Sequence, residues 1–127
     1  MSREDSSAAT ILVVDDFEDL RFTLRIWLEK LGYQVIEAVD GEQAIDITRR
    51  KQPHLILMDI GMPERSGISA AYKIRKDPEL QDIPIVAITA YDTPLLHQEA
   101  VKAGCVECLT KPVDTKRLEE LLVKLLA

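Results

Sequence analysis

Five residues with reactive side chains lie at the ends of short apolar runs in this chain. Asp15 and Asp16 follow the first run, and Asp59 follows the third. Thr89 ends the fourth run, and Lys111 lies just after the fifth. If these runs are parallel β-strands, their carboxyl ends meet at one edge of a sheet, where open α/β sheets bind ligands. The pattern therefore predicts one site that holds three carboxylates, a hydroxyl and an ammonium group.

This combination of groups predicts phosphoryl chemistry assisted by a metal ion. Three neighbouring carboxylates do not all ionise comfortably without a counter-charge. Oxygen ligands from few side chains, completed by several waters, favour Mg²⁺ over zinc. With Mg²⁺ bound, Lys111 and Thr89 would hold the oxygens of a phosphoryl group while one carboxylate attacks phosphorus and forms an acyl phosphate. The predicted cofactor is Mg²⁺.

Apolar runs alternate with helical patterns along the chain. Several of the runs are continuous, which is typical of parallel strands that are covered on both faces. The predicted strands contain residues 11–14, 35–36, 55–58, 85–88 and, more weakly, 108–109. Apolar residues at helical spacing, cap residues and stop signals predict helices over residues 20–31, 41–51, 66–76, 93–104 and from 114 or 115 to the end.

Five consecutive βα units predict a single α/β domain. Repeated βα alternation gives a parallel sheet with helices on both faces, and right-handed crossovers leave few topologies. The predicted fold class is a doubly wound five-stranded parallel sheet with five helices, in three α/β/α layers. Residues 1–9 are small and polar and are expected to form a flexible N-terminal tail before a domain over residues 10–127.

The composition excludes several functional classes. The chain has 127 residues with 16 Lys and Arg against 22 Asp and Glu, so its formal charge is 16 − 22 = −6. An acidic chain is not expected to bind nucleic acid or an anionic membrane by broad electrostatic attraction. No apolar run exceeds four residues, whereas a membrane helix needs about 20. Two cysteines and no apolar leader favour a cytoplasmic location.

The polar residues belong to motifs whose order resembles the receiver domain of two-component response regulators. The motifs are Leu12-Val13-Val14-Asp15-Asp16, Leu57-Met58-Asp59-Ile60-Gly61-Met62-Pro63, Gly67, Ile88-Thr89-Ala90 and Leu109-Thr110-Lys111-Pro112. Together with their spacing, they cover residues 10–127. The resemblance implies a flavodoxin-like fold with strand order 2-1-3-4-5.

The resemblance also implies a role for each residue of the site. Asp59 would be the phosphoacceptor, which attacks a phosphohistidine on a partner protein. Asp16 would ligate Mg²⁺ directly and Asp15 mainly through water. Asp59 and the backbone carbonyl of Gly61 would be further ligands, and Lys111 would pair with the phosphoryl group.

The resemblance implies a switch at Thr89. Its hydroxyl would turn onto a phosphoryl oxygen and draw the following loop inward, with the small Ala90 beside the pocket. The Lys111–Pro112 peptide is implied to be cis. Cys108 departs from the family, which usually carries here an aromatic residue that turns inward with the threonine. We therefore expect phosphorylation to move residues 89–94 more than Cys108.

Other residues bear on regulation and partners. Gly61 and Tyr91 occupy positions at which the family tunes dephosphorylation. Glu64-Arg65-Ser66 replaces a loop that more often contains glycine, which bears on contacts with a kinase. Val123 and Leu126 lie off the core stripe of the last helix, and either belong to a partner surface or pack peripherally.

The function implied by the resemblance is that of a phosphorelay receiver. It would accept a phosphoryl group from a sensor histidine kinase or a histidine phosphotransfer protein. It would then switch a surface for an unknown downstream protein or a fused output domain. Such a chain catalyses only its own phosphorylation and dephosphorylation, so we do not expect an enzyme with a separate substrate. We expect a monomer or a phosphorylation-dependent dimer, with no direct contact to nucleic acid or membrane.

Several other functions compete with this one. One is a degenerate receiver that binds proteins without being phosphorylated. Cys105 and Cys108 form a C-x-x-C that could be a redox pair, although the pair does not open a helix and two small, partly buried cysteines are the simpler interpretation. A phosphatase that works through an aspartyl intermediate needs a second acid two residues after the nucleophile, and this chain has Gly61 there. Nucleotide or flavin binding is not favoured, because the sequence contains no glycine-rich phosphate-binding motif.

Overall fold

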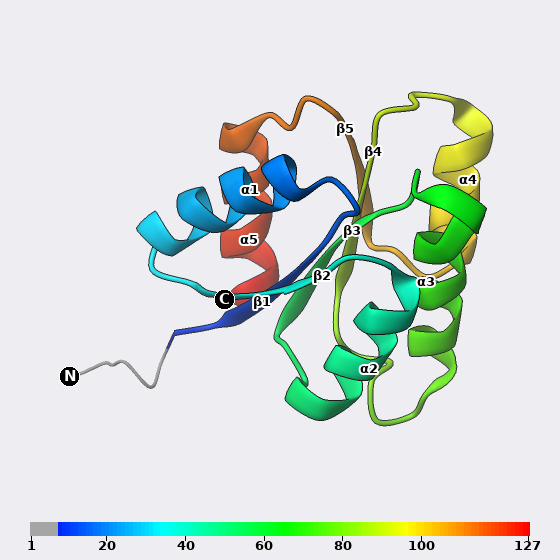
Figure 1. Ribbon diagram of the computed structural model, residues 1–127, viewed down its shortest axis with the longest axis horizontal. Helices are drawn as coiled ribbons and strands as arrows, with labels where there is room; N and C mark the ends of the chain where they lie inside the picture. The colour runs from blue at the N-terminus through cyan, green and yellow to red at the C-terminus, as the bar shows by residue number, and fades with distance from the viewer. Residues whose placement is uncertain (1–7) are drawn as a thin grey trace.

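The computed structural model describes residues 8–127 and contains the five predicted βα units (Figure 1). The strands are β1 (Thr10–Val14), β2 (Gln34–Ala38), β3 (Leu55–Asp59), β4 (Ile85–Thr89) and β5 (Glu107–Thr110). The helices are α1 (Glu18–Lys30), α2 (Gly41–Lys51), α3 (Ser66–Lys76), α4 (Pro94–Lys102) and α5 (Thr115–Leu126), and a short 3₁₀ turn, η2 (Pro63–Arg65), precedes α3. Of the expected tail over residues 1–9, residues 1–7 lie outside the described part of the chain.

The sheet has the predicted order. Its five strands are parallel and run β2-β1-β3-β4-β5, which confirms the fold class. The chain moves from β1 outward to β2 and then crosses to β3 on the other side of β1, so the strand order reverses between β1 and β3. The register pairs Val14 with Met58, and Asp59 with Ile88. The residues that follow β1 therefore lie beside the end of β3, with the end of β4 next to it.

Helices cover both faces of the sheet, which explains the continuous apolar runs. Helices α1 and α5 lie on one face, and α2, α3 and α4 lie on the other (Figure 1). Along β1, Ile11 and Val13 belong to the core under α1 and α5, whereas Leu12 and Val14 belong to the opposite core. Because successive side chains of a strand alternate between faces, a strand with two covered faces must be apolar throughout.

Side-chain caps and glycines mark several helix ends, although α1 begins at Glu18, two residues before the predicted start, without a side-chain cap. The side chains of Asp40, Thr93 and Asp114 accept backbone N–H groups in the first turns of α2, α4 and α5. Gly32 and Gly104 follow α1 and α4 with φ of 99° and 93°. Only glycine adopts this left-handed conformation without a steric penalty, so both positions end a helix where the sequence predicted.

Val123 and Leu126 of α5, the two candidates for a partner surface, differ in their exposure to solvent. Leu126 is partly buried against the core beneath α1 and α5, as is Trp27 of α1. Val123 is 61% exposed. Leu126 therefore packs at the edge of this core, and of the two candidates only Val123 remains available to a partner.

Gly67 joins the start of α3 to the end of β3 at a contact that admits no side chain. A Cβ atom at this position would lie 2.3 Å from the backbone oxygen of Asp59. We expect Gly67→Ala to destabilise the fold by about 1–3 kcal/mol, because the backbone of Asp59 must shift. Denaturant unfolding measures this change. Ser69→Ala, at an exposed position of the same helix, should be close to neutral, and equal stabilities of the two variants would contradict the contact.

Candidate functional site

The carboxylates predicted from the strand ends lie together at the carboxyl edge of the sheet. Asp15, Asp16 and Asp59 each offer a carboxylate oxygen, and these oxygens lie within 4.8 Å of one another. Asp15 is 3% and Asp59 5% exposed, whereas Asp16 is open to solvent. The Asp15 carboxylate also accepts a hydrogen bond of 2.8 Å from the N–H of Phe17, which holds the turn into α1. Two buried carboxylates and one accessible one therefore face a single point.

Lys111 supplies the positive charge of the site. Its Nζ atom lies 3.0 Å from Oδ2 of Asp15 and 3.0 Å from Oδ2 of Asp59, and its side chain is 22% exposed. Burial alone would lower the pKa of this ammonium group, but the hydrogen bonds and charges of the two aspartates outweigh burial and raise the pKa. Lys111 is therefore charged at neutral pH. The Lys111–Pro112 peptide is cis, in agreement with the resemblance.

The loop after β3 contacts the second carboxylate oxygen of Asp59. Oδ1 of Asp59 accepts a hydrogen bond of 2.7 Å from the N–H of Gly61. A Cβ atom at Gly61 would lie 3.2 Å from the ring of Tyr91 and 3.4 Å from Oδ1 of Asp59. Gly61 thus leaves only a narrow gap between the ring of Tyr91 and the carboxylate of Asp59. Gly61 and Tyr91, the two positions at which the family is expected to tune dephosphorylation, are therefore neighbours in space.

Thr89 lies at the end of β4 with its hydroxyl engaged locally. The residue is fully buried, and its hydroxyl oxygen accepts a hydrogen bond of 2.9 Å from the N–H of Tyr91. Ala90, the next residue, is exposed. For the hydroxyl to bond to a ligand above Asp59, it must exchange this contact, and the loop after Thr89 would lose one of its anchors.

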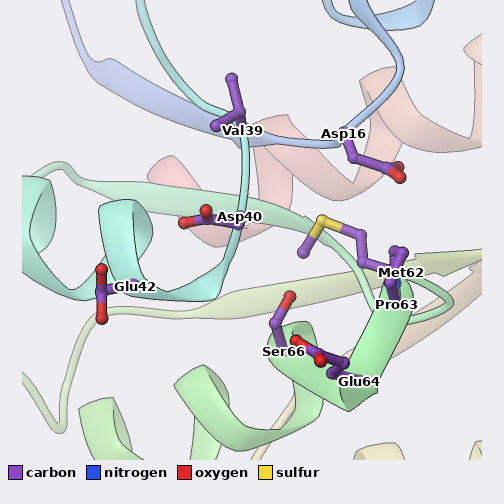
Figure 2. Close-up of a pocket in the computed structure, with 8 residues that line it drawn as sticks. All are labelled: Asp16, Val39, Asp40, Glu42, Met62, Pro63, Glu64 and Ser66. Carbon is purple, nitrogen blue, oxygen red and sulfur yellow. The ribbon is translucent and has the colours of Figure 1, made fainter.

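An acidic cleft that the sequence analysis did not predict opens beside Asp16 (Figure 2). It has a volume of about 460 Å³ and lies between the loops after β1, β2 and β3. Its acidic lining residues are Asp16, Asp40, Glu42 and Glu64. The signal was absent from the sequence because these residues come from three separate segments: the turn after β1, the start of α2 and the 3₁₀ turn η2. A cleft lined by one sign of charge concentrates ions of the other sign, so the approach to Asp16 favours cations.

The loop between β3 and α3 contains two successive non-glycine residues in the left-handed region. Glu64 has φ of 59° and Arg65 has φ of 56°. This conformation disfavours residues with a Cβ atom, so the structure holds the segment against its local preference. Arg65 forms an ion pair with Glu99 of α4 through both of its terminal nitrogens. Arg65 thus connects the segment before α3 to helix α4.

The two cysteines have the properties of structural thiols. Burial raises the pKa of Cys105 to about 12, with a further contribution from Cys108. Burial also raises the pKa of Cys108, with contributions from nearby acidic side chains. Both thiols are free. Since the thiolate is the reactive form, this environment does not support the redox alternative.

Alkylation tests this conclusion about the cysteines. At pH 8 we expect Cys105 to react with iodoacetamide about a thousandfold more slowly in the native protein than in guanidinium, because a pKa of about 12 leaves very little thiolate. Peptide mass analysis measures each cysteine separately. Rapid native labelling of Cys105, or ready formation of a disulfide with Cys108, would restore the redox interpretation.

A family model of the response regulator receiver domain matches residues 11–123. The chain therefore belongs to the response regulator receiver domain family, as the motifs at the strand ends and the order of the strands require. Among residues 8–127, none of the helices combines the length and the apolar character that crossing a membrane needs.

Individual relatives agree with this assignment over nearly the whole chain. Protein PilH of Pseudomonas aeruginosa is 35% identical over 119 residues, which are 94% of this chain and 98% of PilH. The receiver domain of sensor histidine kinase PA1611 from Pseudomonas aeruginosa PAO1, solved with a magnesium ion coordinated in its active-site cleft, is 30% identical with a TM-score of 0.86, covering 94% of this chain and 98% of that one. The chemotaxis protein CheY4 of Vibrio cholerae is 27% identical with a TM-score of 0.86, covering 93% and 98%.

Proposed function

We propose that this chain, as a receiver domain over residues 10–127, accepts a phosphoryl group on Asp59 from the phosphohistidine of a histidine kinase or phosphotransfer protein. The observation that carries the proposal is the convergence of three carboxylates with Lys111 at one sheet edge, with Nζ 3.0 Å from both Asp15 and Asp59. The acceptor is buried and oriented on both oxygens, by Lys111 and by the N–H of Gly61.

The donor set fits Mg²⁺. Asp15, Asp16 and Asp59 offer only carboxylate oxygens, which hard cations prefer, and the exposure of Asp16 leaves room for water ligands. The carbonyl of Gly61 lies in the loop that follows the acceptor and would complete the set. When bound, the ion neutralises charge on the carboxylates and on the oxygens of the incoming phosphoryl group.

The residues of the site divide the reaction between them. A carboxylate oxygen of Asp59 attacks phosphorus, the P–N bond of phosphohistidine breaks, and its electron pair leaves with the imidazole. Lys111, held in its charged form, pairs with the phosphoryl oxygens. Hydrolysis of the acyl phosphate returns the carboxylate and inorganic phosphate. The chain thus turns over no separate substrate, and it acts by presenting a changed surface to a downstream partner.

Beryllium trifluoride, which mimics a phosphoryl group, tests both the site and the switch. We expect it to bind only with Mg²⁺ and to move residues 89–94 more than Cys108, which is observed as larger shifts of the amide resonances of residues 89–93, since Pro94 has no N–H. The reason is that Thr89 must release the N–H of Tyr91 to reach the ligand, whereas Cys108 has no ring to turn. Two-dimensional amide NMR with and without Mg²⁺ measures this. Shifts confined to Cys108, with residues 89–93 silent, would contradict the switch, and absence of binding would contradict the site.

A further inference from the structure

Arg21 of α1 connects the first loop of the site to the second strand. Its Nη1 atom donates a hydrogen bond of 2.8 Å to the backbone oxygen of Asp15. Its Nε atom donates one of 3.0 Å to Oε1 of Glu37 in β2. The side chain is 13% exposed, which is low for an arginine on an outer helix. The planar guanidinium thus holds two acceptors from different elements at once.

The carbonyl group that Arg21 holds belongs to the peptide that joins Asp15 to Asp16. The other backbone contact of Asp15 is its N–H, which donates to the oxygen of Ala38 at 3.2 Å. The N–H of Asp15 belongs to the preceding Val14–Asp15 peptide, whereas its carbonyl belongs to the Asp15–Asp16 peptide. Strand β2 therefore holds the peptide before the Cα atom of Asp15, and Arg21 holds the peptide after it. That peptide sets the directions in which the two consecutive carboxylates leave the chain, one buried and one exposed.

Glu37 fixes the guanidinium in turn. Its two carboxylate oxygens accept from different arginines, Oε1 from Arg21 and Oε2 from Nη1 of Arg25 at 3.0 Å. Arg25 also bonds to Glu29 and is more exposed than Arg21. The described contacts of Arg25 thus lie on the outer side of the network, whereas those of Arg21 reach the loop of the site.

We propose that Arg21 is a positioning residue for the Mg²⁺ site, which acts through the Asp15–Asp16 peptide without touching the ion or the phosphoryl group. This inference rests on the proposed function, because it assigns Arg21 a part in the metal binding proposed for Asp15, Asp16 and Asp59. Partners that orient the first ligands of a metal typically change its affinity about 10-fold to 100-fold when they are removed.

The direction in which Mg²⁺ affinity changes when Arg21 is removed distinguishes a positioning role from a purely electrostatic one. Removal of a positive charge near three carboxylates strengthens the attraction of the site for a cation. If Arg21 acted only through its charge, its loss would therefore tighten Mg²⁺ binding. If Arg21 acts by orienting the Asp15–Asp16 peptide, its loss weakens binding.

The experiment measures metal affinity directly on the full chain. Mg²⁺ binding is followed by isothermal titration calorimetry, and Mn²⁺ binding by electron paramagnetic resonance, for the wild type, Arg21→Met, Arg21→Lys and Arg25→Met. Methionine keeps the apolar part of the arginine side chain and removes its charge. Lysine keeps the positive charge but not the planar guanidinium that binds two acceptors. Arg25→Met is the matched control on the same helix, since it removes an arginine that also bonds to Glu37. Thermal unfolding fixes a temperature at which every variant is folded.

We expect Arg21→Met to weaken Mg²⁺ binding about 10-fold to 100-fold, with Arg21→Lys weakened in the same direction and Arg25→Met unchanged or slightly tighter. At saturating Mg²⁺, phosphorylation of Arg21→Met by acetyl phosphate should return to the wild-type rate, which a general structural defect would not permit. Unchanged or tighter binding by Arg21→Met overturns the inference, and so does wild-type affinity in Arg21→Lys, which would show that the planar guanidinium with its two acceptors is not required. If the wild type binds no Mg²⁺, the proposed function fails and this inference falls with it.

Discussion

Replacement of Lys111 by methionine is expected to slow phosphorylation of Asp59 by acetyl phosphate about 100-fold to 1,000-fold, the range seen when one preorganised donor to a developing charge is removed. Nζ of Lys111 lies 3.0 Å from the acceptor carboxylate, so no rearrangement is needed to meet the incoming phosphoryl oxygens. The rate of adduct formation at saturating Mg²⁺, followed by intact mass, measures the effect. Lys116→Met, at an exposed position of α5, should react at the wild-type rate.

The same substitution is expected to destabilise the metal-free fold by about 3 kcal/mol, because it leaves the buried carboxylates of Asp15 and Asp59 without their partner. The pKa of Lys111 is raised in the folded chain. The stabilisation is therefore fully present below the ordinary lysine pKa of about 10.4 and is lost as the pH rises through the higher folded value. The stability difference between wild type and variant should be constant around neutral pH and should narrow as the pH rises through the alkaline range. A difference that vanished near pH 7 would contradict the ion pair.

Asp59→Asn is expected to abolish the phosphoryl adduct completely. The amide has the shape of the carboxylate, and its oxygen can still accept the hydrogen bond from the N–H of Gly61, so the loop is preserved. An amide is neutral and does not form an acyl phosphate, so the nucleophile is lost while the surroundings remain. Intact mass after incubation with acetyl phosphate and Mg²⁺ detects the adduct, and circular dichroism checks the fold.

Asp46→Asn provides the matched control for the acceptor, because Asp46 is an exposed aspartate of α2 whose carboxylate pairs only with Arg50 among the described contacts. It should carry the same adduct as the wild type. An undiminished adduct on Asp59→Asn would mean that another residue is phosphorylated, and the assignment of the acceptor would be wrong.

Much of the fold and most of the site could be predicted from the sequence because they depend on local patterns. The apolar runs around Ile11 and Ile56 are continuous since both faces of β1 and β3 are covered, and the sequence records this directly. Strand ends then place Asp15, Asp59 and Lys111 together by topology alone. The cap residue Thr93 marked the start of α4 for an equally local reason.

Contacts between distant segments could not be predicted, because no local pattern records them. Arg75 of α3 donates hydrogen bonds to the backbone oxygens of Ile83 and Gly104, two segments joined only by the tertiary fold. In the sequence Arg21 is an ordinary arginine of a helix, and nothing near it indicates its hydrogen bond to the Asp15 carbonyl. The left-handed Glu64 and Arg65 run against their local preference, so sequence signals that favour glycine in this conformation did not apply.

The most direct test of the account is the intact mass of the wild-type chain after incubation with acetyl phosphate, with Mg²⁺ in one sample and with a chelator in the other. We expect a single phosphoryl adduct that forms only with Mg²⁺ and is removed by hydroxylamine, as an acyl phosphate should be. No adduct with Mg²⁺ present, or an equal adduct in the chelated sample, would contradict it. In the first of these cases, together with no binding of beryllium trifluoride, the chain would be a receiver that binds proteins without being phosphorylated.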